Sequence, residues 1–204
     1  METPLTANPA TLPGYTPVIH DATRLGVVHL TARNLPRLVA FYRDRIGLRV
    51  HRETPEFAAL GAGGEDLLHL TGNPEAPRVD RAAGLYHFCL KVEDRRDFAR
   101  WLAHLVATHT PLAGLVDHRF AEAIYLDDPE GNGVELNWDR PRSEWPDPSV
   151  VIRLGNAALD VEGLEGLLTD AAPWEGVPAD TTVSHIHLHV GDLGAAEQIG
   201  RAHV

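Results

Sequence analysis

The stretch that decides the fold is residues 25–48, which read LGVVHLTARNLPRLVAFYRDRIGL. The first seven residues are β-prone and predict a strand over 25–31. Asn34 is a good N-cap for the helix that follows, and Pro36 falls in its first turn, where a missing N–H costs little. Apolar side chains then recur at helical spacing until Gly47, a typical helix end. They are Leu35, Leu38, Val39, Tyr42 and Ile46.

The same pattern occurs a second time further along the chain. Three short strands are predicted after the first helix, at 48–53, 56–61 and 66–71. Another strand, 85–92, precedes a helix that begins at Asp94, and three further strands are predicted at 114–119, 122–127 and 133–138. The two helix caps lie 94 − 34 = 60 residues apart. Each unit is therefore βαβββ, which predicts an α+β fold in which the paired units form a curved, cup-like sheet.

The units divide the chain into four segments. We expect an N-terminal arm over 1–24, one domain over 25–140 with units at about 25–75 and 84–140, and a proline-rich connector over 141–181 with a helix at 161–168. A third copy starts at Thr182, and its cap Asp192 lies 192 − 94 = 98 residues after the second. Because 60 residues are needed and 23 remain, we interpret 182–204 as the truncated, poorly anchored start of a second domain.

Composition excludes several classes of partner. The chain has 204 residues, and 18 Lys and Arg against 29 Asp and Glu give a net charge of −11. This charge argues against binding to nucleic acid or to an anionic membrane surface. Apolar runs are too short to span a bilayer, and residues 1–15 do not resemble a secretory signal. A single cysteine, Cys89, allows no internal disulfide. We therefore expect a soluble, cytoplasmic protein.

Equivalent strand positions point to a metal site. The residue seven places before each helix cap is Val27 (34 − 7), His87 (94 − 7) or His185 (192 − 7). In the last strand of each complete unit the matching residues are His69 and Glu135. Side chains of a strand alternate between its faces, so paired units would direct Val27, His69, His87 and Glu135 into one cavity. Two imidazoles and one carboxylate suit Fe(II) and also accept Zn, Mn or Ni.

Three motifs resemble those of the vicinal oxygen chelate superfamily, which includes glyoxalase I, bleomycin-resistance proteins and extradiol ring-cleavage dioxygenases. The motifs are residues 25–35, the pair Phe41–Asp44 with Ile46–Leu48, and Asp128–Leu136, which reads DPEGNGVEL. The resemblance covers 25–139 and, for the third unit, 182–197. It implies a paired βαβββ cup around a divalent metal, and it is strongest for the catechol 2,3-dioxygenase-like branch.

The resemblance also implies roles for single residues. His87 and Glu135 match metal ligands of this branch, whereas Val27 occupies the position of the remaining histidine and cannot bind a metal. His69 could complete the ligand set, or the domain could bind Fe(II) weakly or not at all, which we favour. Tyr125 lies 135 − 125 = 10 residues before the glutamate, as in this branch.

Two further histidines take their interpretation from the same resemblance. His118 is near the position of an active-site histidine, and together with Tyr125 it would hydrogen-bond the substrate and shuttle protons. His185 would be the first ligand of a separate, incomplete metal site in the second domain.

The implied activity is opening of an aromatic ortho-diol by O2 at Fe(II). The alternatives are a glyoxalase-type isomerase or lyase that uses Zn or Ni, and a metal-free binding or resistance protein, which Val27 favours. In each case the partner is a small molecule and neither nucleic acid nor membrane is involved. Association of identical chains stays open.

Overall fold

The computed structural model describes residues 23–78, 82–169 and 173–196. Ten strands lie in this part of the chain: β1 (Val28–Ala32), β2 (Arg49–Glu53), β3 (Phe57–Gly61), β4 (Asp66–Gly72), β5 (Gly84–Val92), β6 (Gly114–Asp117), β7 (Ala121–Asp127), β8 (Gly133–Asp139), β9 (Ala157–Ala158) and β10 (Thr182–His189). The helices are α1 (Leu35–Phe41), which continues as a π-helical turn (Tyr42–Ile46), α2 (Arg95–Ala107), a 3-10 turn (Arg142–Glu144), α3 (Pro148–Leu154) and α4 (Val161–Gly166). No helix among the described residues is long and apolar enough to cross a membrane.

The first unit forms a four-stranded sheet in the order β1-β4-β3-β2, with β1 and β4 parallel and the other pairs antiparallel. The predicted cap is present, since the side chain of Asn34 accepts a hydrogen bond from the backbone N–H of Arg37. The helical segment ends at Gly47, whose φ of 89° lies in the left-handed region that favours glycine.

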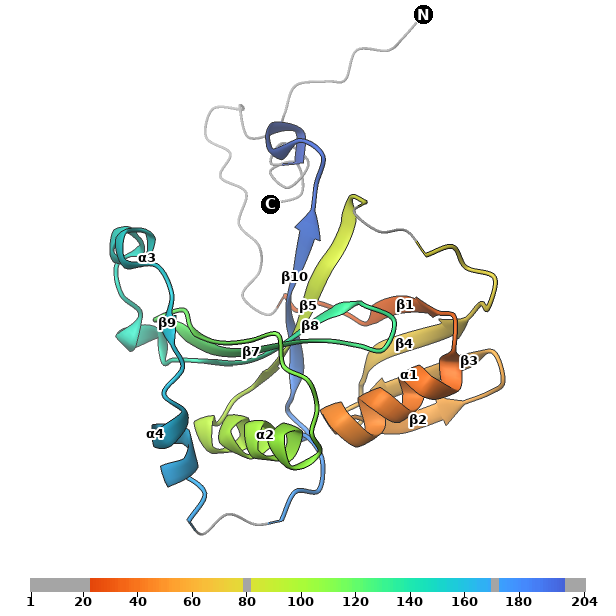
Figure 1. Cartoon of the computed structure of the whole chain (residues 1–204), viewed down its shortest axis with the longest axis horizontal. Helices are drawn as coiled ribbons and strands as arrows, with labels where there is room; N and C mark the ends of the chain where they lie inside the picture. The colour runs from red at the N-terminus through yellow and green to blue at the C-terminus, as the bar shows by residue number, and fades with distance from the viewer. Residues whose placement is uncertain (1–22, 79–81, 170–172, 197–204) are drawn as a thin grey trace, which may run out of the picture.

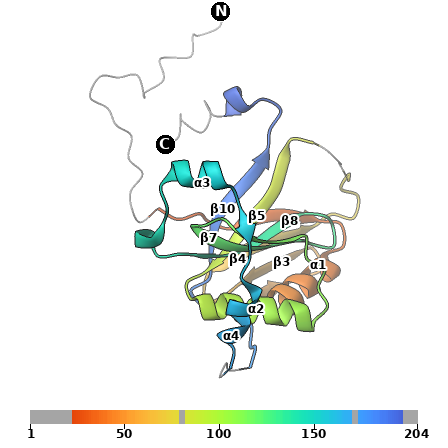
Figure 2. The ribbon, with the colours of Figure 1, turned by 60° about the vertical axis from the view of Figure 1, so that its left-hand side comes forward.

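The second unit repeats this arrangement within a six-stranded sheet ordered β10-β5-β8-β7-β6-β9. Strands β5 and β8 are parallel, as β1 and β4 are in the first unit. Asp94 caps α2 by accepting a hydrogen bond from the N–H of Arg96. Helix α1 packs against the four-stranded sheet, and α2 lies below the six-stranded sheet in Figures 1 and 2.

The α+β class and the order of elements in both units are therefore confirmed. The expectation of one curved sheet was wrong in one respect, because the two units contribute to separate sheets. Strand β5 has β10 as its neighbour on the edge away from β8, whereas β1 pairs with β4 alone among the described strands. The third copy of the first strand thus occupies the place beside the second unit.

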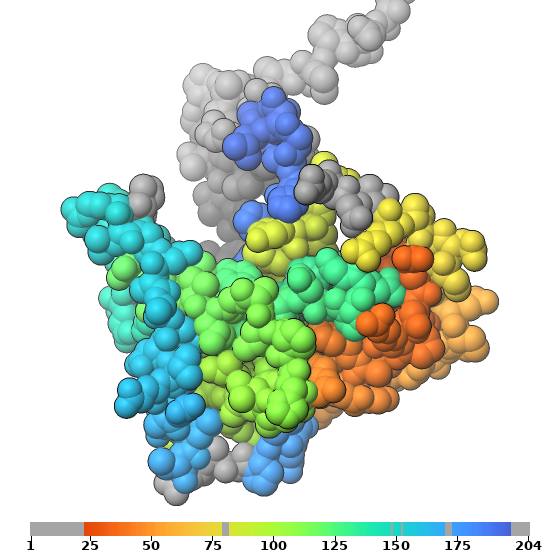
Figure 3. Space-filling model, viewed as in Figure 1, coloured from red at the N-terminus to blue at the C-terminus, as the bar shows by residue number. Residues whose placement is uncertain are grey.

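A common core and a set of polar contacts hold the units together, and their surfaces adjoin in Figure 3. The buried hydroxyl of Tyr42 donates to Asp128 Oδ2 at 2.8 Å, and the indole N–H of Trp101 donates to the carbonyl of Ile46 at 2.8 Å. In the DPEGNG turn, the carboxylate of Glu130 accepts the backbone N–H groups that precede α1. The motif that carried the resemblance is therefore also an inter-unit contact.

The end of the described chain is better anchored than the sequence indicated. Strand β10 pairs antiparallel with β5, with Thr182 opposite Lys91 at one end and His189 opposite Gly84 at the other. Beyond it, Asp192 Oδ1 accepts the N–H of Ala195, as expected for a helix cap. The prediction of an unanchored strand was wrong, whereas the assignment of 182–204 to a second domain stays a prediction. The arm at 1–22 lies outside the described residues.

Candidate metal centre

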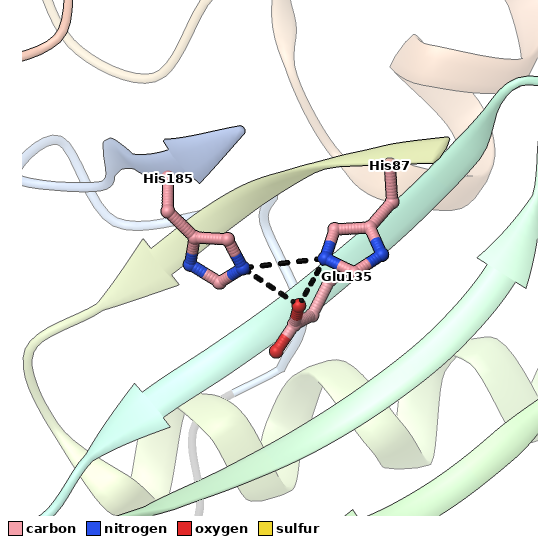
Figure 4. A group of neighbouring side chains, drawn as sticks. All are labelled: His87, Glu135 and His185. Atoms are coloured by element: carbon pink, nitrogen blue, oxygen red, sulfur yellow. Dashed lines mark hydrogen bonds and ion pairs between the residues drawn. The ribbon is translucent and has the colours of Figure 1, made fainter. Parts of the chain in front are cut away.

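Three neighbouring strands bring His87, Glu135 and His185 together (Figure 4). His87 lies in β5, and Glu135 lies in β8 directly opposite Cys89 of β5. On the other side of β5, the register of β10 shifts between Val183 and Ile186, so that His185 falls in the irregular part of the ladder. This irregularity bends the strand locally and directs its side chain toward the other two.

The three facing ligand atoms form a compact triangle. Glu135 Oε2 lies 2.9 Å from His87 Nε2 and 3.0 Å from His185 Nε2, and the two nitrogens are 3.3 Å apart. Ligand atoms about 2.1 Å from one ion lie about 3.0 Å apart at right angles and about 3.4 Å apart in a tetrahedron. The triangle therefore has the size of one face of a metal's coordination shell.

Burial and charge prepare these groups for a cation. His87 and Glu135 are 5% and 2% exposed, whereas His185 is half-buried. Burial would raise the pKa of the Glu135 carboxyl, but the hydrogen bond from His185 and the charges of both imidazoles outweigh this and lower the pKa. The hydrogen bond to Glu135 raises the pKa of His185, and burial lowers the pKa of His87. The site thus offers a carboxylate whose charged form is favoured and two imidazoles whose pKa values are shifted in opposite directions.

The donor set fits a divalent transition metal. Two imidazoles and a carboxylate on one face leave the opposite positions open, which suits Fe(II) and is compatible with Zn, Mn and Ni. A metal there would also satisfy a buried carboxylate that otherwise needs charged partners. Among the described residues, this is the group of His, Cys, Asp and Glu side chains whose ligand atoms lie within reach of one ion.

A cavity of about 400 Å³ adjoins this group. His87 lines it together with His118 and Tyr125, which are the two residues predicted from the sequence to handle protons. The hydroxyl of Tyr125 lies 2.8 Å from His118 Nε2. Burial, and then the charge of Glu135, raise the pKa of Tyr125, so the phenol keeps its proton near neutral pH.

His69 lies apart from this cavity. It belongs to β4 in the other sheet, where its Nε2 is 2.8 Å from Asp66 Oδ2 and its ring contacts that of His29 edge-on. His51 approaches the second oxygen of the same carboxylate at 2.8 Å. These two hydrogen bonds lower the pKa of Asp66. The expectation that His69 shares a cavity with His87 and Glu135 was therefore wrong.

His185 lies at the third ligand position, for which the sequence analysis considered Val27 and His69. The count of seven residues before the cap had already made His185 equivalent to His87, but it was assigned to a separate site. Pairing of β10 with β5 places it in the same one. Other residues of the cavity were not predicted, among them His187, which lies opposite His87 in the ladder, and Asn156 of the connector.

Comparisons with known proteins identify a family for this chain. A family model described as the glyoxalase/bleomycin resistance protein/dioxygenase superfamily matches residues 24–136. A protein named catechol-2,3-dioxygenase from Bacillus subtilis (strain 168) is 40% identical over 186 residues, which cover 88% of this chain and 64% of that protein. The chain thus spans less than two thirds of the length of this curated relative.

Two solved structures illustrate the likeness in three dimensions. A lactoylglutathione lyase from Agrobacterium tumefaciens is 27% identical, with a TM-score of 0.47 over 58% of this chain and 96% of that one. The cppA protein from Streptococcus pneumoniae TIGR4 is 16% identical, with a TM-score of 0.50 over 78% of this chain and 57% of that one. The second likeness concerns the fold alone.

Proposed function

Because the chain belongs to the glyoxalase/bleomycin resistance protein/dioxygenase superfamily, we propose that it carries the site of a ring-cleaving dioxygenase for aromatic ortho-diols. The observation that carries this proposal is the triangle of His87, Glu135 and His185 beside a cavity that contains His118 and Tyr125. The 40% identity to a protein named catechol-2,3-dioxygenase supports it.

In this proposal His87, Glu135 and His185 hold Fe(II). The metal, when bound, would supply Lewis-acid chemistry for the diol and a site for O2. The protein's part is to present three ligands on one side, so that the opposite side stays available to both reactants. The neighbouring strands fix the ligand positions, because His87 and Glu135 sit in paired ladders and His185 lies between two paired parts of β10.

His118 and Tyr125 would manage the protons of the diol. An ortho-diol that binds a cation must release a proton, and the imidazole of His118 lines the cavity within hydrogen-bond distance of the Tyr125 hydroxyl. Because the pKa of Tyr125 is raised, the phenol acts as a hydrogen-bond donor to a bound oxygen and not as a base. The pair thus combines one proton acceptor with one fixed donor.

The rest of the cavity suits a flat, uncharged ring. Val116 and Ala113 contribute apolar surface, and Tyr86 and His187 contribute rings. The residues that line it include no Lys or Arg among those the structure describes. A substrate with a carboxylate on the ring would therefore find no cationic partner and would lose its hydration without compensation.

The two alternative activities predict other observations. Val27 favoured a metal-free protein, but His185 provides the imidazole that Val27 lacks, which supports a metal-loaded site. A glyoxalase-type enzyme would work with Zn or Ni and would consume no O2. Oxygen consumption therefore separates the two metal-dependent activities.

The experiment is an oxygen-electrode assay on the purified chain reconstituted with Fe(II) under anaerobic conditions. With catechol, we expect one O2 consumed per ring opened, and loss of this activity in Glu135→Gln. The conservative replacement keeps the size of the side chain and removes its charge. A chain that binds Fe(II) at this site but consumes no O2 with any unsubstituted or alkyl-substituted diol would refute the proposed function.

A further inference from the structure

The backbone around His118 places one residue of the connector against its ring. Strand β9 pairs antiparallel with β6, with Ala158 opposite Val116 and Ala157 opposite Asp117. Continued by one residue, this register sets Asn156 opposite His118. The preceding residue is held as well, because Arg119 Nε donates to the carbonyl of Gly155 at 2.9 Å. Asn156 is therefore positioned by its neighbours on both sides.

Both nitrogens of the His118 ring have a partner. Nδ1 lies 2.9 Å from Asn156 Oδ1, and Nε2 lies 2.8 Å from the hydroxyl of Tyr125. The amide oxygen of asparagine can only accept a hydrogen bond. Nδ1 of His118 must therefore carry a proton and donate it to Asn156.

The hydrogen bond between Tyr125 and His118 Nε2 can run in either direction, because a phenol both donates and accepts. If His118 receives this hydrogen bond, its ring is neutral with the proton on Nδ1. If Tyr125 receives it, Nε2 of His118 donates to the phenol oxygen, and the ring carries both protons. In both arrangements Nδ1–H faces Asn156, and only Nε2 gains or loses a proton.

We propose that Asn156 is a positioning residue that keeps the Nδ1 proton of His118 in place and so confines proton exchange to Nε2, the nitrogen that faces Tyr125. A neutral imidazole without such a partner exchanges between two tautomers, and in the Nε2–H tautomer it has no lone pair to offer on that side. The structural part of this inference is independent of the reaction. Its kinetic consequence rests on the proposed function.

The structural test is the tautomer of His118, measured by long-range ¹H–¹⁵N correlation of the ring nitrogens, with and without added Zn(II). The His118 signals are identified by their absence in His118→Gln. In the unaltered chain we expect the neutral ring to be protonated at Nδ1. Asn156→Ala should move a large fraction to the Nε2–H tautomer, whereas Asn156→Asp, which keeps an acceptor oxygen, should retain Nδ1–H.

Because Asn156 is exposed, its replacement leaves the core intact. Ser149→Ala, in α3 of the same connector, is the matched control and should leave the tautomer unchanged. An Nε2–H tautomer in the unaltered chain would overturn the inference. An Nδ1–H tautomer that persists unchanged in Asn156→Ala would also overturn it, whatever the activity.

The kinetic test applies once ring cleavage is measured. Asn156→Ala should lower kcat about tenfold, a part of the ~10²–10⁴-fold that general acid–base catalysis contributes, with KM changed less than about twofold. Asn156→Asp should recover most of the loss. Equal kcat in Asn156→Ala and the unaltered enzyme would overturn the kinetic consequence. Failure of ring cleavage with the expected tautomers would instead refute the proposed function and leave the positioning role standing.

Discussion

Replacing His185 by alanine should remove most of the chain's affinity for a divalent metal. The imidazole supplies one corner of a triangle with sides of 2.9, 3.0 and 3.3 Å, so two ligand atoms would be left. Loss of a group that merely orients a ligand typically weakens metal binding ~10–100-fold. Loss of the ligand itself should therefore cost at least about 100-fold, which corresponds to about 2.8 kcal/mol.

This loss of metal affinity would not result from unfolding. The side chain of His185 is 43% exposed, so truncation leaves no closed cavity in the core. Competition with a chromophoric chelator gives the dissociation constant for Zn(II) or Fe(II), and circular dichroism monitors the fold. His189→Ala, on the same strand and exposed, is the matched control.

The same assay distinguishes the ligand set in the structure from the one considered in the sequence analysis. His69→Ala should leave metal affinity unchanged, since His69 pairs with Asp66 in the other sheet. If His69→Ala releases the metal while His185→Ala does not, the site described above is wrong, and the ligand set of His69, His87 and Glu135 takes its place.

Three further predictions concern the backbone, the pH dependence and the substrate. Gly133→Ala should disturb the site and lower metal affinity, because a Cβ there would lie 2.1 Å from the carbonyl oxygen of Tyr86. Gly64→Ala, which has open space around it, is the control and should have no effect. Circular dichroism reports the fold of each variant, and metal titration reports its affinity. Without added metal, stability from the Glu135–His185 pair should be lost as pH rises through the raised pKa of His185, and as pH falls through the lowered pKa of Glu135. Thermal unfolding from pH 4 to 9 checks this, and a profile that is identical in His185→Ala would contradict it. In the oxygen assay, kcat/KM should be at least about tenfold higher for catechol than for a carboxylated catechol, since no Lys or Arg among the described residues lines the cavity; equal values would argue that the substrate binds elsewhere.

The sequence predicted local structure well because the signals were local. The caps at Asn34 and Asp94 and the apolar stripe between the first cap and Gly47 each depend on residues close together in the chain, and the structure has them where expected. His87 and Glu135 were also paired correctly, because they lie on adjacent parallel strands of one unit.

The third corner of the site could not be predicted in the same way. Which strand lies beside β5 is a choice between distant segments, β1 and β10, whose first-strand patterns are nearly alike. The count of positions made Val27 and His185 equivalent but contained no information on which of them would be the neighbour. Likewise, the contact of Asn156 with His118 depends on the short pairing of β9 with β6, for which two residues give almost no sequence signal.

Strand β10 lies at the edge of its sheet and contributes one of the three ligands, so a bound ion would fasten this strand to β5 and β8. Strand docking and ion binding then strengthen each other to the same extent, as any two linked equilibria must. At a free ion concentration 100 times the dissociation constant, the fastened state gains about 2.7 kcal/mol. Depletion of the ion would remove this added stability and leave β10 held by its pairing with β5 alone.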